Sequence, residues 1–149
     1  RYAPERALLM IYMDTSALVP AFIREPKSEA VLAWIEASGE ALVVSEWSIT
    51  EFSSAAAIKV RTGELASAMA KQARTRFLEF AQEHCSIAVP QRSEFRRAAE
   101  LAGDANLKLR AGDALHLAIA EASRVQGILC LDETMGAGAK TIGLNVVSV

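Results

Sequence analysis

Four acidic residues stand where they could bind a metal ion together. Asp14 directly follows a short apolar run, Leu8–Met13, and Asp132 follows a second such run. Glu51 and Asp113 lie near the starts of two segments with helical periodicity. No Lys or Arg stands at matched spacing beside Asp14 or Asp132, so carboxylates that converged here would repel and raise each other's pKa. A hard divalent cation bound through oxygen atoms, Mg²⁺ or Mn²⁺, would resolve that repulsion.

Each of these acids also has an ordinary structural explanation. Acidic residues are favoured as helix N-caps and in the first helical turn, where they stabilise the helix dipole. The segment Asp14-Thr15-Ser16 reads as a turn that opens a helix, so capping and metal binding are both compatible with Asp14. Glu51 fits a capping box, but Ser45 is the better helix start and leaves Glu51 more than one turn inside the helix. For the other two acids both alternatives stay open.

Short apolar runs alternate with segments of helical periodicity, and this alternation predicts the elements that position the acids. The runs are too short for typical helices and lack a helical period, so we interpret them as buried strands. They cover residues 8–13, 41–44, 86–89, 128–131 and 144–147. Helices are expected at 17–22 (interrupted at Pro20), 27–38, 46–60, 64–83, 93–102 and 113–125, with a turn at 132–134. The pattern predicts an α/β fold with three layers, α/β/α, around a central parallel sheet of about five strands.

This architecture predicts which of the acids should lie close together. In a parallel sheet the carboxyl ends of the strands and the first turns of the following helices share one edge, where open α/β sheets bind ligands. Asp14 and Asp132 should therefore lie close together if their strands are neighbours. Asp113 reaches the same edge only if its helix runs back over the sheet, and periodicity does not determine that step.

The composition narrows the class of protein. A length of 149 residues suggests one domain, and a hydrophobic content of 52% is far above that of a disordered chain. A formal net charge of -2 argues against a strongly basic, non-specific nucleic-acid binder. Cys85 and Cys130 lack the spacing of a metal or redox motif, so we interpret both as buried apolar residues in a reducing compartment. No apolar run reaches membrane-spanning length. Residues 1–9 are interpreted as an N-terminal extension without signal-peptide character, and 10–149 as the domain.

Several motifs in combination resemble the PIN-domain family, in particular the VapC-type toxins of bacterial and archaeal toxin–antitoxin pairs. They read IYMDTSAL at residues 11–18, TEF at 50–52 after Ser45, GDALHLAIA at 112–120 and LCLD at 129–132. The resemblance extends over nearly the whole chain from Met10. Residues 133–138 depart from it, because ETMGAG replaces the basic and apolar helix start that is usual in the family. This departure leaves Glu133 as an alternative to Asp132.

The resemblance implies a PIN-like fold and a Mg²⁺- or Mn²⁺-dependent endoribonuclease that cleaves single-stranded or looped RNA through a metal-activated water. The acids that match the family's metal-binding and catalytic positions are Asp14, Glu51, Asp113 and Asp132. Thr15 and Ser16 match a supporting hydroxyl position beside the first acid. The resemblance further implies a cytoplasmic protein, a homodimer and a cognate antitoxin that covers the acidic pocket. The helix pair within residues 46–83 is the expected surface for both partners.

Other residues are assigned with less specific signals. Four basic residues in turns near the same sheet edge are the expected RNA contacts: Arg24, Lys27, Lys108 and Arg110. His116, three residues after Asp113, shares its helical face and is interpreted as a partly buried, hydrogen-bonded residue. Two other functions stay open. One is a phosphotransfer or phosphatase domain with Asp14 as acceptor, although the second acid and the downstream Lys of such domains are missing. The other is a catalytically inactive PIN-like binding module.

Overall fold

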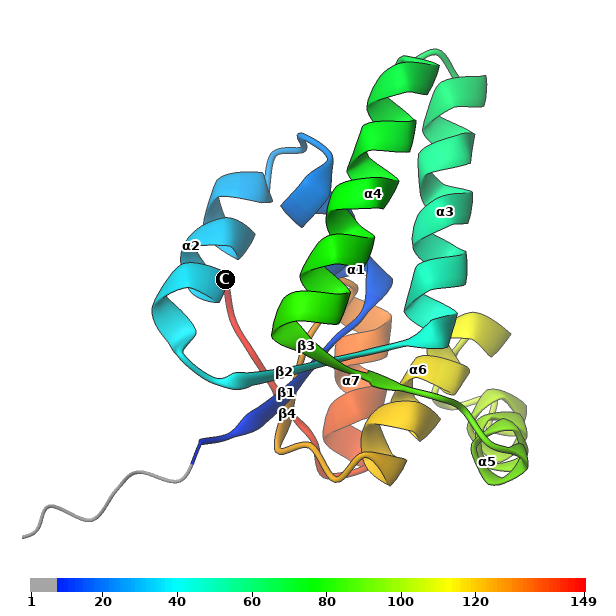
Figure 1. The fold of residues 1–149 in the computed structure, drawn as a ribbon. Coiled ribbons are helices and arrows are strands. Elements are labelled where there is room, and N and C mark those ends of the chain that lie inside the picture. Colours follow the sequence, from blue (N-terminus) through cyan, green and yellow to red (C-terminus); the bar gives the residue numbers. More distant parts are fainter. Residues whose placement is uncertain (1–7) are drawn as a thin grey trace, which may run out of the picture.

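Five parallel strands form one sheet, which the computed structural model describes together with the helices around it over residues 8–149 (Figure 1). The order across the sheet is β3-β2-β1-β4-β5. The strands are β1 (Met10–Met13), β2 (Ala41–Ser45), β3 (Cys85–Ala88), β4 (Gly127–Leu129) and β5 (Asn145–Val146). The predicted α/β class, the parallel direction and the number of strands are therefore confirmed.

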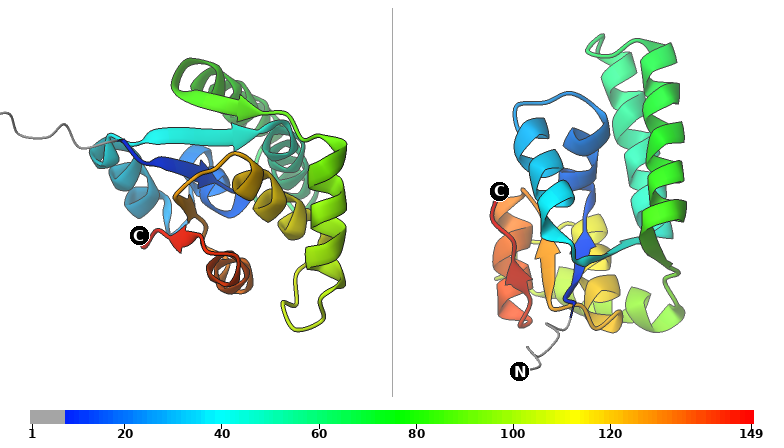
Figure 2. Two further views of the ribbon diagram at one scale, coloured as in Figure 1. Left: turned by 90° about the horizontal axis from the view of Figure 1, so that it is seen from below. Right: turned by 60° about the vertical axis from the view of Figure 1, so that its left-hand side comes forward.

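Helices cover both faces of this sheet, so the predicted three layers are present (Figure 2). The helices are α1 (Thr15–Phe22), α2 (Ser28–Ser38), α3 (Glu46–Arg61), α4 (Ser67–His84), α5 (Arg92–Gly103), α6 (Ala111–Ala122) and α7 (Glu133–Thr141). Apolar side chains of α1 to α4 pack with Ile11 and Met13 on one face of β1. Those of α5 to α7 pack with Tyr12 on the other face. Alternation along the strand thus divides the core into two clusters.

The strand order reverses beside β1. The chain moves outward from β1 through β2 to β3 and then returns to place β4 on the other side of β1. The carboxyl ends of β1 and β4 therefore flank a topological switch point, where open α/β sheets bind ligands. Met13 pairs with Leu129, and the backbone N–H of Asp14 donates to the Leu129 carbonyl oxygen at 3.3 Å. Asp14 consequently lies at the mouth of this crevice.

One helix was not predicted from the sequence. Helix α7 follows Asp132, where only a turn was expected, because Gly136 and Gly138 lower the helix propensity of this segment. A Cβ atom on Gly138 would lie 3.1 Å from Leu117 Cδ1 and 3.2 Å from Leu109 Cδ2, so the missing side chain lets α7 approach α6 closely. Tertiary packing outweighs local propensity here.

The predicted interruption of the first helix at Pro20 is wrong. Helix α1 runs from Thr15 to Phe22 with Pro20 inside it. Proline removes one helical hydrogen bond, but residues 17–21 are all buried. Burial of this short helix under the sheet compensates for the missing hydrogen bond.

Three smaller expectations concern the rest of the chain. Cys85 and Cys130 are free; Cys130 is buried as expected, whereas Cys85 is only half-buried, and loss of contact with water raises the pKa of each thiol to about 12. None of the helices within residues 8–149 is both long and apolar enough to cross a membrane. Of the proposed extension, residues 1–7 lie outside the described part. Leu9 already contacts the sheet, since its carbonyl accepts from the Ala41 N–H at 3.0 Å.

Candidate active site

Asp14 is buried at the carboxyl end of β1, with 2% of its surface exposed. Its carboxylate caps α1: Oδ1 accepts from Ser16 Oγ at 2.8 Å, and Oδ2 accepts from the Ser16 N–H at 3.3 Å. Ser16 Oγ also accepts from the Leu131 N–H at 2.8 Å, which ties Asp14 to the end of β4. The helix cap anticipated for Asp14 is present, and it fixes the carboxylate at the switch point.

Burial also changes the protonation of Asp14. Removal of the carboxylate from water raises its pKa to about 6, while His116 and the hydrogen bonds from Ser16 oppose this rise. The negative charge of Asp113 raises the pKa further. Asp14 and Asp113, almost a hundred positions apart in sequence, therefore interact electrostatically in the fold.

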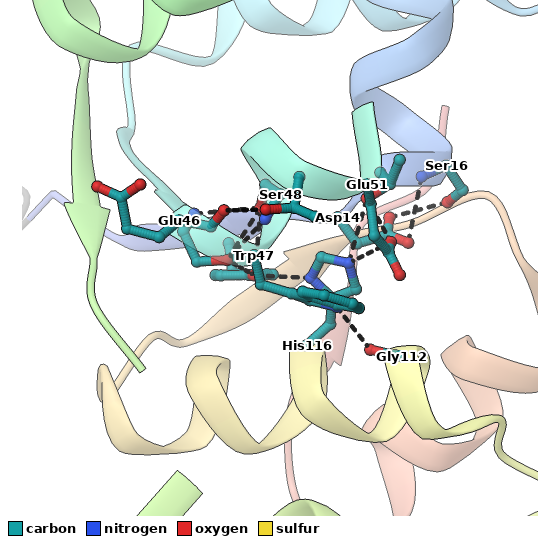
Figure 3. Close-up of polar contacts among 12 residues, drawn as sticks. Asp14, Ser16, Glu46, Trp47, Ser48, Glu51, Gly112 and His116 are labelled. Carbon is teal, nitrogen blue, oxygen red and sulfur yellow. Dashed lines mark hydrogen bonds and ion pairs between the residues drawn. The ribbon is translucent and has the colours of Figure 1, made fainter. Parts of the chain in front are cut away.

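Glu51 points from α3 toward α1 and α6 (Figure 3). Its Oε2 accepts from Thr15 Oγ1 at 2.7 Å and lies 2.8 Å from His116 Nε2. Burial raises the pKa of Glu51, but His116 and Thr15 lower it more, so the net direction is downward and Glu51 is ionised at neutral pH. A Cβ atom on Gly112 would lie only 2.6 Å from Oε1, so this second oxygen lies against the first turn of α6.

Glu51, Asp113 and Asp132 line one cavity of about 470 Å³ at this edge of the sheet. Asp132 caps α7, since its Oδ1 accepts from the Met135 N–H at 2.7 Å. Asp113 lies in the first turn of α6, and within residues 8–149 its carboxylate has no hydrogen bond or ion pair. Burial and the negative charges of Asp132 and Glu51 raise the pKa of Asp113. The cavity therefore holds negative charge that nearby cations only partly offset.

The oxygen donors at this cavity suit a hydrated divalent cation. In the side-chain conformations of residues 8–149, no three Asp, Glu, His or Cys side chains lie close enough together to bind one metal ion directly. Mg²⁺ keeps several water ligands and binds proteins through only one or two carboxylates, so the wider spacing is compatible with it. Asp113 is the acid of this cavity whose carboxylate has no hydrogen bond from residues 8–149, and a cation would relieve the repulsion by Asp132 and Glu51 that helps to raise its pKa.

The basic residues predicted as RNA contacts divide into two groups. Lys108 and Arg110 line the same cavity as the acids. Lys27 does not: its Nζ donates to the Val149 carbonyl oxygen at 3.1 Å, and it borders another cavity of about 580 Å³. Arg24 is exposed and lines neither cavity.

The alternative fourth acid, Glu133, is placed less favourably than Asp132. Glu133 borders the larger cavity beside α7, whereas Asp132 borders both that cavity and the one that Glu51 and Asp113 share. The geometry therefore favours Asp132 as the member of the acidic group.

His116 and Tyr12 connect to the acids more directly than the sequence indicated. His116 was expected to be hydrogen-bonded and partly buried; it is hydrogen-bonded, and its side chain is fully buried. Tyr12 was not singled out, although its position two residues before Asp14 on a strand places both side chains on the same face. Its hydroxyl lies 2.7 Å from His116 Nδ1.

Comparison with known proteins adds a family and a set of similar folds. The sequence matches the PIN domain family over residues 11–139. VapC20 from Mycobacterium tuberculosis, a sarcin-ricin loop cleaving toxin, has a TM-score of 0.68 at 13% identity, over 85% of this chain and 93% of that one. FitAcB from Neisseria gonorrhoeae has a TM-score of 0.65 at 17% identity, over 93% of this chain and 97% of that one. VapBC-1 from nontypeable Haemophilus influenzae has a TM-score of 0.62 at 12% identity, over 94% of this chain and 98% of that one. No curated protein matches the sequence significantly.

Proposed function

The chain belongs to the PIN-domain family, and from this premise we propose that it is a Mg²⁺- or Mn²⁺-dependent endoribonuclease, the toxin of a VapBC-type toxin–antitoxin pair. The observation that carries the proposal is the cavity at the switch point, which Glu51, Asp113 and Asp132 line and beside which Asp14 is buried. The structural similarity to VapC20 supports the same activity.

The four acids have different tasks in this proposal. Asp113, whose carboxylate has no hydrogen bond from residues 8–149, would hold the divalent cation, and Asp14, Glu51 and Asp132 would hold it directly or through water. When bound, the cation would lower the pKa of a water and neutralise charge on the phosphate oxygens. Thr15 holds Glu51, and Ser16 holds Asp14, so these hydroxyls keep the carboxylates oriented.

The substrate is single-stranded or looped RNA, whose phosphates can enter a cavity that a duplex cannot. Lys108 and Arg110 border the acids, and we assign them to the phosphates on either side of the cleaved bond. The phosphotransfer alternative is less well supported. Asp14 is 2% exposed and bonded to Ser16, so it is a poor acceptor for a phosphoryl group.

We infer the protein partners from the structural neighbours and from exposed apolar residues on two helices. The structural neighbours FitAcB and VapBC-1 support an antitoxin partner, whose basic side chain would pair with Asp113 in the cavity. Exposed apolar residues on the α3–α4 pair, Ile58 and Met69, suit the antitoxin or homodimer surface. We place the protein in the cytoplasm, where it meets cellular RNA.

The test is incubation of the purified protein with mixed cellular RNA in Mg²⁺, in Mn²⁺ and in EDTA, beside Asp14→Asn. Cleavage that needs the cation and is lost in the variant supports the nuclease. An acid-stable phosphate on Asp14 would support the phosphotransfer domain. Absence of cleavage of any RNA by wild-type protein would support the inactive binding module.

Substitution of Gly112 should separate activity from stability. In Gly112→Ala the new methyl group meets Glu51 Oε1 at 2.6 Å and displaces the carboxylate. We expect cleavage to fall by about 10- to 100-fold, the usual cost of disturbing the groups around a metal site. Alanine is the better helix former by about 1 kcal/mol, so the thermal midpoint should not fall.

Gly103→Ala is the matched control, since no atom lies within 4 Å of a Cβ placed on Gly103. This control should keep full cleavage activity. Equal activity in both alanine variants would show that the position of Glu51 against Gly112 is unimportant.

Lys108 combines a charge in the cavity with an unusual backbone. Its φ is 56°, a left-handed conformation that costs an ordinary L-residue about 1–2 kcal/mol. Lys108→Gly should therefore leave the free energy of unfolding unchanged or slightly higher, while the KM for RNA rises several-fold and its salt dependence weakens.

Arg124 offers a matched control, because it is also basic, also exposed and also left-handed, with φ at 55°, but follows α6 at the opposite end from Asp113. Arg124→Gly should have the same effect on stability and none on KM. If both variants raise KM alike, the local role of Lys108 is wrong.

A further inference from the structure

His116 uses both of its ring nitrogens inside the core. Its Nε2 lies 2.8 Å from Glu51 Oε2 and 3.1 Å from Thr15 Oγ1, and its Nδ1 lies 2.7 Å from the Tyr12 hydroxyl (Figure 3). The side chain is fully buried in a helix whose other buried members are Ala, Leu and Ile. A polar ring at this position costs desolvation, so its hydrogen bonds must be satisfied.

The direction of each hydrogen bond follows from the groups involved. An ionised carboxylate only accepts, so Nε2 carries the proton and donates to Glu51. In the neutral ring, Nδ1 is then the acceptor, and the Tyr12 O–H donates to it. The Tyr12 oxygen also lies 2.8 Å from Ser45 Oγ, the N-cap of α3.

These contacts form a closed loop through the fold. It starts at Ser45, the last residue of β2 and the N-cap of α3, passes through Tyr12 on β1 and His116 on α6, and reaches α3 at Glu51. Aromatic neighbours limit rotation of the imidazole: its centroid lies 5.7 Å from that of Tyr12 and 6.5 Å from that of Trp47. Trp47 itself is held by its Nε1, which donates to the Gly112 carbonyl oxygen at 3.2 Å.

The loop determines which Glu51 oxygen is left for the cavity. Two donors occupy Oε2, Thr15 and His116, whereas Oε1 lies against Gly112 with no hydrogen bond from residues 8–149. Glu51 is a long side chain with three rotatable bonds, and without these contacts its carboxylate would be free to turn away into solvent.

From this geometry we propose that His116 and Tyr12 are positioning residues, which hold Glu51 in the orientation that binds the divalent cation. The inference rests on the proposed metal-dependent function and deepens it. His116 itself does not contact the cation or the RNA. Its effect passes through Glu51, so loss of the Nε2 donor should weaken cation binding even when the protein stays folded.

Two substitutions of His116 test the hydrogen bonds of its two ring nitrogens one at a time. The amide nitrogen of Gln can reach the position of Nε2, so His116→Gln retains a donor for Glu51. The amide of Asn reaches only the position of Nδ1. His116→Asn therefore retains a hydrogen-bond partner for the Tyr12 hydroxyl and loses the hydrogen bond to Glu51. The measurement is Mn²⁺ affinity, by titration calorimetry or by the electron paramagnetic resonance signal of free Mn²⁺, on the full chain without RNA.

We expect His116→Gln to bind Mn²⁺ within about 3-fold of the wild type and His116→Asn to bind about 10- to 100-fold more weakly, as for other groups that orient metal ligands. Tyr12→Phe, which removes only the hydroxyl, should weaken binding by a smaller factor. Ile119→Val is the control for a damaged core: it should lower the free energy of unfolding by about 1 kcal/mol and leave Mn²⁺ affinity unchanged.

The outcomes distinguish this inference from the proposed function. If the wild type binds Mn²⁺ and cleaves RNA but Gln and Asn weaken Mn²⁺ binding equally, or only in proportion to lost stability, His116 is merely structural and the positioning role is wrong. If the wild type neither binds Mn²⁺ nor cleaves RNA, the metal-dependent function fails, and the positioning role fails with it.

Discussion

Asp113→Asn is expected to lower the rate of RNA cleavage by about 10³-fold while leaving the free energy of unfolding unchanged or higher. The large effect on rate follows from the proposed role of this oxygen as a direct cation donor, because charge stabilisation by a bound metal contributes several kcal/mol to catalysis. The small effect on stability follows from the structure. Within residues 8–149 the Asp113 carboxylate has no hydrogen-bond partner to lose, and it is repelled by Asp132 and Glu51.

Single-turnover cleavage and urea denaturation of the same preparation measure the two quantities. Asp104→Asn is the control, because Asp104 is an exposed acid that ends α5 outside the cavity, and Asn can still accept from the Asn106 N–H. EDTA should reduce the wild type to the level of Asp113→Asn and should not reduce the variant further. A variant that cleaves RNA at the wild-type rate would remove Asp113 from the mechanism.

The second large effect concerns Asp14 and pH. Burial raises the pKa of this carboxyl in the folded protein to about 6, from its ordinary value of 3.8. The folded state therefore holds the proton more tightly than the unfolded state does. Its contribution to stability is fully present below pH 3.8 and is lost as pH rises to about 6. The difference in pKa corresponds to about 3 kcal/mol.

Asp14→Asn should remove this loss of stability at rising pH, because Asn is as good an N-cap as Asp and has no charge that folding would bury. In EDTA, the free energy of unfolding of the variant should match that of the wild type near pH 4 and exceed it by up to about 3 kcal/mol at pH 7. Denaturant titrations between pH 4 and 7.5 measure this difference. A difference that stays constant over this range would show that ionisation of Asp14 does not destabilise the fold.

Mn²⁺ provides an independent check on the same pair of proteins. A cation that binds the ionised carboxylate should stabilise the wild type at pH 7, by an amount that grows with Mn²⁺ concentration. Asp14→Asn, which lacks the charge, should gain much less. At neutral pH the ionised carboxylates of Asp14 and Asp113, whose pKa values are raised, thus destabilise the metal-free protein, whereas Glu51, whose pKa is lowered, does not.

The sequence by itself determined the class of fold and the position of each acid along the chain. Strand and helix periodicities are local, so the alternation of elements and the parallel sheet were predictable. The start of α3 at Ser45 was predictable for the same reason, since a cap depends on residues within one turn. Where local signals conflict with packing, prediction failed: α7 forms despite two glycines, and α1 continues through Pro20.

The tertiary structure alone decided how the acids come together. Asp14 lies beside the end of the strand that leads to Asp132, because β4 pairs with β1, and no local pattern encodes that pairing. Asp113 reaches this edge because only residues 123–126 join α6 to β4, so α6 runs back along the sheet and begins near the strand ends. Contacts between distant segments likewise place Lys108 and Lys27 at different cavities. Such contacts also connect Tyr12 through His116 to Glu51. Such contacts arise from packing of whole elements, and sequence periodicity carries information only about each element alone.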